Sequence, residues 1–185
     1  MENINTILKT NTAELHKKLE QIGFVDKIFN KSLTLEEYKK LILANYIFHL
    51  PLEENLKKIS ENANWNIQWK IPFLEKDRVA LGSFAIPEIE NTFIPKDFYE
   101  ALGCLYVLEG ATLGGKVIKR QLETLPIQMN YYGCYGEDNT AHWKNFMQLL
   151  STQVDTESKA AITLSAAKQT FEFGIRCFEL ATLKR

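Results

Sequence analysis

Apolar residues recur along most of this chain at the spacing of amphipathic α-helices. Between residues 4 and 20, the isoleucines and leucines lie roughly on one side of a helix and are interleaved with charged residues, which predicts a helix with one buried face. A short helix is expected from Phe24 to Phe29. Further helices are expected over residues 32–60 with a kink at Pro51, and over 73–84, 95–125, 142–152 and 157–183.

The ends of these segments carry the residue types that start and stop helices. Ser32 or Thr34 can cap the helix that Glu36 and Glu37 open, because a side-chain oxygen accepts from free backbone N–H groups there. The turn-rich stretches 62–72, 86–96 and 130–140 are predicted loops, and no alternating pattern supports a sheet. The sequence therefore predicts one all-α domain over 1–185, in which polar groups between facing helices are the place to look for chemistry.

The stretch "YVLEGATLGGKV" (106–117) places three glycines, Gly110, Gly114 and Gly115, inside an expected helix. Each costs about 1 kcal/mol relative to alanine in a helix interior. Gly110 and Gly114 share one helix face, while Gly115 lies about 100° round the axis. Two explanations stay open: close helix packing or a kink at this point, or a flat, bulky ligand that rests on the bare backbone.

The chain has three histidines, His16, His49 and His142, and no H-x-x-H or H-E-x-x-H motif, so zinc hydrolysis is not expected. Glu20 lies one helical turn after His16. Its carboxylate can hold the Nδ1 proton and leave Nε2 free for a metal, although such pairs are common as surface ion pairs. His49 is interpreted as a core histidine, and His142 is placed in a first helical turn.

Composition excludes several classes of protein. Lys and Arg number 22 and Asp and Glu 23, a net charge of −1, which gives no overall attraction to nucleic acid or membranes. The sequence shows neither a signal peptide nor an apolar run of about 20 residues, so a cytoplasmic protein without a membrane anchor is predicted. The three cysteines lack a C-x-x-C motif and are interpreted as reduced, packed thiols.

Four segments in order resemble the heme oxygenase family: "LKTNTAELHKKLE", "YIFHLPLEENL", "YVLEGATLGGKVIKRQL" and "FEFGIRCFEL". The similarity is greatest to the bacterial branch that supplies biliverdin to bacterial phytochromes. It implies an all-α multi-helix bundle that holds heme between a proximal helix and a kinked, glycine-containing distal helix. It also implies cleavage of heme, both substrate and cofactor, to biliverdin, CO and ferrous iron with O₂ and electrons from a ferredoxin or reductase.

The resemblance also implies roles for individual residues. His16 matches the axial iron ligand and Glu20 the carboxylate that orients it. Gly110, Gly114 and Gly115 match the distal glycines whose backbone approaches the heme. Lys9 and, less closely, Lys144 match basic positions that contact the heme propionates. Phe178, with Phe171 and Phe173, resembles the aromatic wall around the macrocycle, although core packing explains the same spacing.

Two positions depart from the family pattern. Ala111 stands where animal relatives have an aspartate that organises proton-delivering waters, and Gln148 stands where many relatives have an arginine near the propionates. Glu109 and Thr112 are close to Ala111 in sequence but point in other directions on a helix. Five basic residues could form a surface that binds an acidic electron donor: Lys17, Lys18, Lys116, Lys119 and Arg120. They could equally be ordinary solvated positions on helix faces.

Two other functions compete with heme cleavage. The departures at Ala111 and Gln148 suit a non-catalytic heme- or tetrapyrrole-binding protein on the same fold. A different ligand is the other possibility, since related helical folds serve thiamin metabolism and di-iron chemistry. The E-x-x-H ligand pattern of di-iron sites does not occur in this sequence, which disfavours that version.

Overall fold

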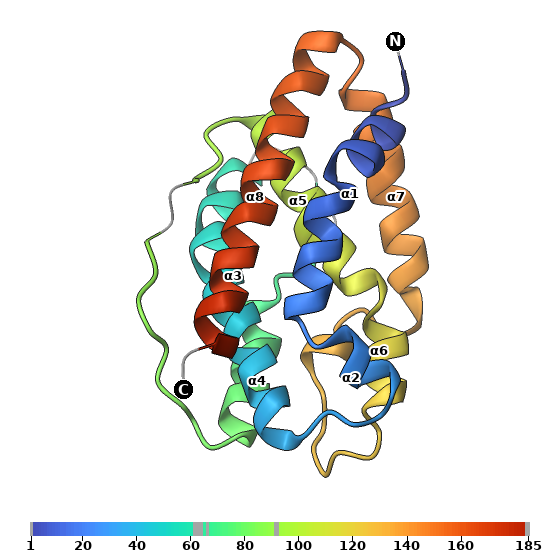
Figure 1. Ribbon diagram of the computed structural model, residues 1–185. Coiled ribbons are helices and arrows are strands. Elements are labelled where there is room, and N and C mark those ends of the chain that lie inside the picture. The colour runs from blue at the N-terminus through green and yellow to red at the C-terminus, as the bar shows by residue number, and fades with distance from the viewer. Residues whose placement is uncertain (1, 61–64, 66, 91–92, 184–185) are drawn as a thin grey trace.

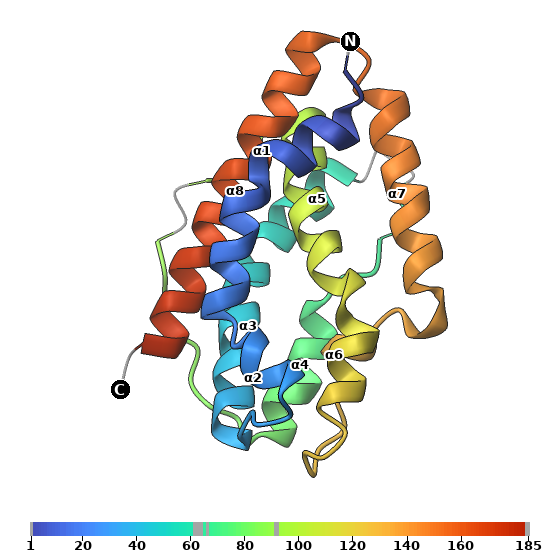
Figure 2. The same cartoon turned by 45° about the vertical axis from the view of Figure 1, so that its right-hand side comes forward.

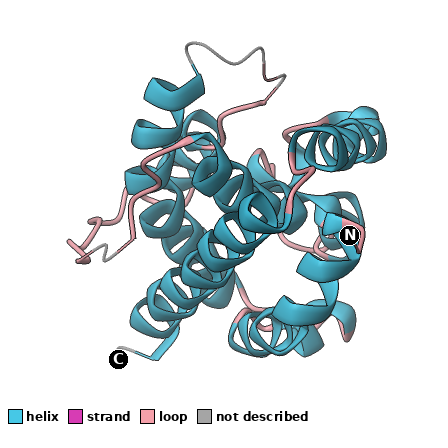
Figure 3. Ribbon diagram, turned by 90° about the horizontal axis from the view of Figure 1, so that it is seen from above, coloured by secondary structure: helices cyan, strands magenta, loops and turns pink. Residues whose placement is uncertain are grey.

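The computed structural model describes residues 2–60, 65, 67–90 and 93–183, without the side chains of Thr112, Lys116, Glu137 and Leu183. All regular structure in this part of the chain is helical (Figure 3). The α-helices are α1 (Ile4–Ile22), α2 (Val25–Phe29), α3 (Leu35–Ser60), α4 (Ile71–Ala80), α5 (Phe98–Leu113), α6 (Gly115–Gln121), α7 (Asn139–Gln153) and α8 (Glu157–Leu183), and two 3₁₀ turns are η1 (Tyr131–Gly133) and η2 (Gly136–Asp138).

The long helix α8 is the centre of the packing. It runs beside α1, α3 and α5 (Figure 1), which are the helices it contacts most extensively. The buried core includes Leu8 of α1, Phe48 of α3, Leu105 of α5 and Phe173 of α8. Helix α7 packs against both α1 and α5. The all-α fold predicted from periodicity is therefore confirmed.

Side-chain caps fix where the principal helices begin. Thr34 and Glu37 form a reciprocal pair, because Thr34 Oγ1 accepts from the Glu37 N–H at 3.2 Å and Glu37 Oε2 accepts from the Thr34 N–H at 3.0 Å. Thr34 is thus the cap of α3, which continues through Pro51 to Ser60. Asp97 Oδ1 accepts from the N–H groups of Tyr99 and Glu100. Helix α5 therefore begins after Asp97, not at Pro95.

The single continuous helix expected over 95–125 is wrong, because a turn at Gly114 separates two helices. Helix α5 ends at Leu113 and α6 runs from Gly115 to Gln121. Figure 2 shows α6 continuing below α5 with a change of direction. The cause is contact with a distant segment: a Cβ on Gly115 would lie 2.8 Å from the backbone oxygen of Tyr132. Glycine lets α6 pack directly on η1, within the stretch expected to be a plain loop.

A glycine pair at this break allows a stability test. We expect Gly115→Ala to lower the free energy of unfolding by about 1–3 kcal/mol, because the new Cβ must push backbone away. Gly114→Ala is the matched control, since its Cβ would meet only the Ile118 side chain at 3.8 Å and should leave stability unchanged or slightly raised. Urea unfolding of both variants measures the difference. Equal midpoints would contradict the packing role of Gly115.

Within the described residues, no helix combines the length and the apolar character needed to cross a membrane.

Candidate functional site

A cavity of about 450 Å³ lies between α1 and the α5–α6 break. Figure 2 shows α1 and α5 facing each other on this side of the molecule. Its walls come from seven helices and η1, and most of the side chains are apolar or aromatic. Among the lining residues are His16 and Glu20 of α1, Gly110, Ala111 and Gly114 of the break, Asn45 of α3, Tyr131 and Tyr132 of η1, Trp143 of α7, and Phe171 and Phe178 of α8.

His16 lies on the α1 wall of the cavity. Its Nδ1 is 3.5 Å from Glu20 Oε2, one turn along the helix, and its side chain is 55% exposed. The ring meets Phe171 edge to face, with the centroids 5.9 Å apart. Because Glu20 lies on the Nδ1 side of the ring, Nε2 is the ring nitrogen left for a metal. The predicted pairing of His16 with Glu20 is thus present and borders a cavity.

Gly110 and Gly114 lie on the wall across from α1. A Cβ at Gly110 would come no closer than 3.5 Å to Trp143, and one at Gly114 no closer than 3.8 Å to Ile118. Both distances are ordinary van der Waals contacts, so helix packing does not require glycine at either position. The bare backbone instead leaves space in the cavity. Gly115 differs, since it packs on Tyr132 and does not line the cavity.

The aromatic residues of α8 divide between two roles. Phe171 and Phe178 are buried and line the cavity, in the position expected of an aromatic wall. Phe173 is fully buried away from it, where its ring lies 5.9 Å from that of Phe48. Core packing therefore holds for Phe173, and the role of Phe171 and Phe178 around a macrocycle stays a prediction.

The basic residues singled out in the sequence lie outside the cavity wall. Lys9 is exposed on α1, two turns before His16, and Lys144 is exposed on α7, next to the lining residue Trp143. Gln148 is exposed one turn after Lys144. On the surface, Lys17, Lys119 and Arg120 are exposed and Lys18 lies 3.6 Å from Glu179, while the side chains of Thr112 and Lys116 lie outside the described set.

Sequence patterns did not identify the η1 residues that close the cavity. Asp77 of α4 is completely buried and binds this turn: its Oδ1 accepts from the backbone N–H of Asn130 at 2.8 Å, and its Oδ2 from that of Tyr131 at 2.9 Å. The predicted loop over 130–140 therefore places Tyr131 and Tyr132 on the cavity wall. The pair of aromatic residues in "NYYG" was the available signal.

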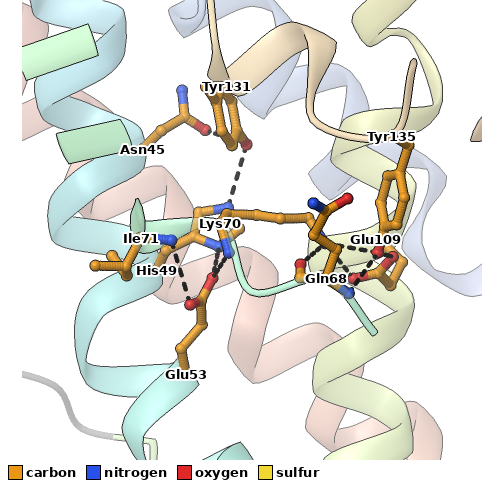
Figure 4. A network of polar contacts seen from close by, with 9 residues as sticks. All are labelled: Asn45, His49, Glu53, Gln68, Lys70, Ile71, Glu109, Tyr131 and Tyr135. Atoms are coloured by element: carbon orange, nitrogen blue, oxygen red, sulfur yellow. Dashed lines mark hydrogen bonds and ion pairs between the residues drawn. The ribbon is translucent and has the colours of Figure 1, made fainter. Parts of the chain in front are cut away.

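A buried polar network lies behind the cavity, between α3, α5 and the 67–70 segment (Figure 4). His49 is fully buried, with Nδ1 3.0 Å from Glu53 Oε1 and Nε2 3.1 Å from the Tyr131 hydroxyl. The interpretation of His49 as a satisfied core histidine is confirmed. Lys70 donates to Glu109 Oε1 at 2.6 Å and to the Tyr135 hydroxyl at 2.9 Å.

The Lys70–Glu109 pair fixes the helix that carries the bare backbone. Glu109 immediately precedes Gly110, and the side chains of Lys70 and Glu109 are only 2% and 7% exposed. Tyr135 also donates to Glu109, and burial together with this carboxylate raises the pKa of the Tyr135 hydroxyl, which therefore stays a donor. The pair ties α5 to the 67–70 segment beside the cavity.

Comparisons with known proteins find similarity to heme oxygenases. Residues 2–79 match the family model described as heme oxygenase. A heme oxygenase of Xanthomonas campestris pv. campestris (strain 8004) is 29% identical over 115 residues, which are 59% of this chain and 67% of the relative.

Solved structures show the same fold. The heme oxygenase of Neisseria meningitidis superimposes with a TM-score of 0.79 at 17% identity, covering 100% of this chain and 94% of that one. Heme oxygenase-1 of the cyanobacterium Synechocystis sp. PCC6803, solved in complex with heme, gives 0.76 at 16% identity, covering 96% and 91%. The fold is thus the all-α fold of the heme oxygenases. The family-model match over residues 2–79 and the Xanthomonas relative are similarities to heme oxygenases at the level of sequence.

Proposed function

We propose that this chain binds heme in the cavity between α1 and α5 and cleaves it to biliverdin, CO and ferrous iron. The observation that carries the proposal is the pairing of a carboxylate-held histidine, His16, with the bare backbone at Gly110 and Gly114 across one apolar cavity. O₂ and electrons from a ferredoxin or reductase are the expected co-reactants. The proposal includes the bacterial branch, in which a bacterial phytochrome receives the biliverdin.

The residues present fit a heme. The cavity volume is in the range of small-molecule sites, and its wall is mainly apolar, as a porphyrin requires. His16 Nε2 would hold the iron, and the bound heme would supply the iron centre that takes up O₂ and the ring that is cut. A neutral imidazole ligand suits this chemistry, and none of the three free cysteines lines the cavity.

Other residues of the chain would orient the heme and exclude water. Glu20 holds the Nδ1 proton of His16 and so fixes the tautomer of the ring. Gly110 and Gly114 allow backbone to approach the opposite face of the ligand, where it limits the space next to the iron. Phe171 and Phe178 cover the edge of the cavity.

Two exposed lysines beside the cavity would hold the propionates. Lys9 lies two helical turns before His16 on α1, and Lys144 is next to Trp143 in the sequence. Gln148 is neutral, so no arginine at that position can form a bidentate contact with a propionate. The two lysines would therefore bind the propionates by single charged contacts. The exposed Lys17, Lys119 and Arg120 would meet an acidic electron donor.

A turnover experiment tests the proposal. The purified chain is loaded with one equivalent of hemin and given ascorbate in air, with catalase present to suppress oxidation by free peroxide. We expect the Soret band to decline and biliverdin absorbance to appear, while free hemin under the same conditions gives no biliverdin. A Soret band that stays intact would favour the second candidate, a non-catalytic heme-binding protein, for which Ala111 on the cavity wall is the supporting observation.

A further inference from the structure

A chain of hydrogen bonds leads from the buried carboxylate of Glu53 to the wall of the cavity (Figure 4). His49 Nδ1 is 3.0 Å from Glu53 Oε1, and His49 Nε2 is 3.1 Å from the Tyr131 hydroxyl. The same hydroxyl donates to Asn45 Oδ1 at 2.9 Å. Tyr131 and Asn45 both line the cavity. The ring of His49 is therefore in direct contact with the hydroxyl of a residue that lines the cavity.

Counting hydrogens at Tyr131 shows which partner donates. Asn45 Nδ2 donates to the Leu41 carbonyl at 2.8 Å, which fixes the amide orientation and leaves Oδ1 as the atom that faces Tyr131. Oδ1 can only accept, so the single hydrogen of the Tyr131 hydroxyl is used there. The contact between Tyr131 and His49 Nε2 then needs a hydrogen from the ring, and Nε2 must be protonated.

The other ring nitrogen faces a carboxylate that is itself an acceptor. Glu53 Oε1 accepts from the Lys70 N–H at 2.7 Å and Oε2 from the Ile71 N–H at 3.3 Å. Burial raises the pKa of the Glu53 carboxyl, but the hydrogen bond and charge of His49 and the two backbone donors outweigh it, so this pKa lies below its usual range. Because both Glu53 oxygens already accept from backbone N–H groups, Glu53 is assigned as the carboxylate and Nδ1 of His49 as the donor of their contact.

The charges around the ring agree with this protonation state. The side chains of His49 and Glu53 are 0% and 3% exposed, and an imidazolium beside a carboxylate leaves no net charge in the core. The neighbouring Lys70–Glu109 pair is also neutral as a whole. Burial raises the pKa values of the Tyr131 and Tyr132 hydroxyls, and the other titratable groups that act on these two hydroxyls include Cys134 and Asp77.

We propose that the His49 ring is held as an imidazolium and supplies a proton, through the hydroxyl of Tyr131, to an acceptor bound in the cavity. Tyr131 turns its O–H bond from Asn45 to an acceptor in the cavity and gives up that proton. In the same step it takes the Nε2 proton of His49, which leaves a neutral ring held by Glu53. Water returns the proton afterwards. This proposal rests on the proposed function, and it supplies the proton source that Ala111 cannot provide.

The protonation state can be measured on the heme-free protein. With only three histidines in the chain, ring-nitrogen NMR of protein labelled with ¹⁵N-histidine gives three sets of signals, and a His49→Gln variant identifies those of His49. We expect both His49 nitrogens to be protonated at pH 7. A His49 ring with one unprotonated nitrogen at that pH would overturn the proposal, whatever the protein does with heme.

A pair of tyrosine variants tests delivery to the cavity. Tyr131→Phe keeps the ring and removes the hydroxyl, and we expect about 100-fold slower hemin conversion with unchanged hemin affinity and Soret spectrum. Tyr46→Phe is the matched control on α3, because its hydroxyl bonds Glu75 and it does not line the cavity. It should convert hemin at the rate of the unaltered chain.

The outcomes separate this proposal from the proposed function. Equal conversion rates for Tyr131→Phe and Tyr46→Phe would overturn the delivery role while heme cleavage itself stands. If the unaltered chain binds hemin but never consumes it, the proposed function fails and proton delivery fails with it. The nitrogen shifts would then still report the state of His49 by themselves.

Discussion

His16→Ala is expected to abolish the histidine-ligated spectrum of the ferric hemin complex and to weaken hemin binding by at least about 10-fold. His16 is the histidine on the cavity wall, and the Glu20 contact prepares its ring as a ligand. Alanine leaves the iron without a protein ligand on the α1 side, while the apolar walls still hold part of the porphyrin surface. Hemin titration followed by Soret absorbance and electron paramagnetic resonance measures both effects.

His142→Ala is the matched control for this substitution. His142 stacks on Tyr135 with the ring centroids 4.3 Å apart, on α7, and it does not line the main cavity. Its hemin spectrum should be that of the unaltered chain. Added imidazole should also restore a histidine-like spectrum to His16→Ala. Identical spectra for His16→Ala and the unaltered chain would show that another group binds the iron.

Lys70→Met is expected to lower the free energy of unfolding by about 3–5 kcal/mol, which is the cost of removing one member of a buried ion pair. Its ammonium group donates to Glu109 at 2.6 Å and to the Gln68 carbonyl at 2.6 Å, and both members of the pair are nearly inaccessible. Methionine keeps the length of the side chain but leaves the Glu109 carboxylate without its cation. Urea unfolding measures the loss.

Two further variants show whether the pair itself is responsible. Lys159→Met removes an exposed lysine that pairs with Asp155 at 2.6 Å, and no measurable loss is expected because water screens such pairs. The double variant Lys70→Met with Glu109→Leu should recover part of the stability, since no unpaired charge then remains buried. A double variant no more stable than Lys70→Met would instead assign the loss to packing.

The helices could be predicted because each carries its own periodicity. The segments 4–20 and 157–183 repeat their apolar residues along one face, and α1 and α8 follow these limits within two residues. A kink was one of two explanations for the glycine stretch, but its physical cause at Gly114 could not be predicted in the same way. It depends on the approach of the Tyr132 backbone to Gly115, a contact between segments that no local pattern describes.

The same distinction applies to the site. His16 with Glu20, and Gly110 with Gly114, are each separated by one helical turn, so their spacing indicates a shared face. That the two pairs meet at one cavity is a result of the tertiary fold. The network of His49, Tyr131 and Asn45 joins residues up to 86 positions apart. The buried carboxylate of Asp77 holds η1 in place and so brings these residues together. No pattern in the sequence predicts that contact.

Single-turnover product analysis tests heme cleavage by this chain most directly. The chain is loaded with one equivalent of hemin, reduced through a ferredoxin and ferredoxin reductase in air, and the products are separated by chromatography while CO and ferrous iron are measured. Cleavage in the cavity predicts biliverdin, CO and ferrous iron in equal amounts, and predicts none of them from His16→Ala. Recovery of intact hemin from the unaltered chain after reduction would contradict it.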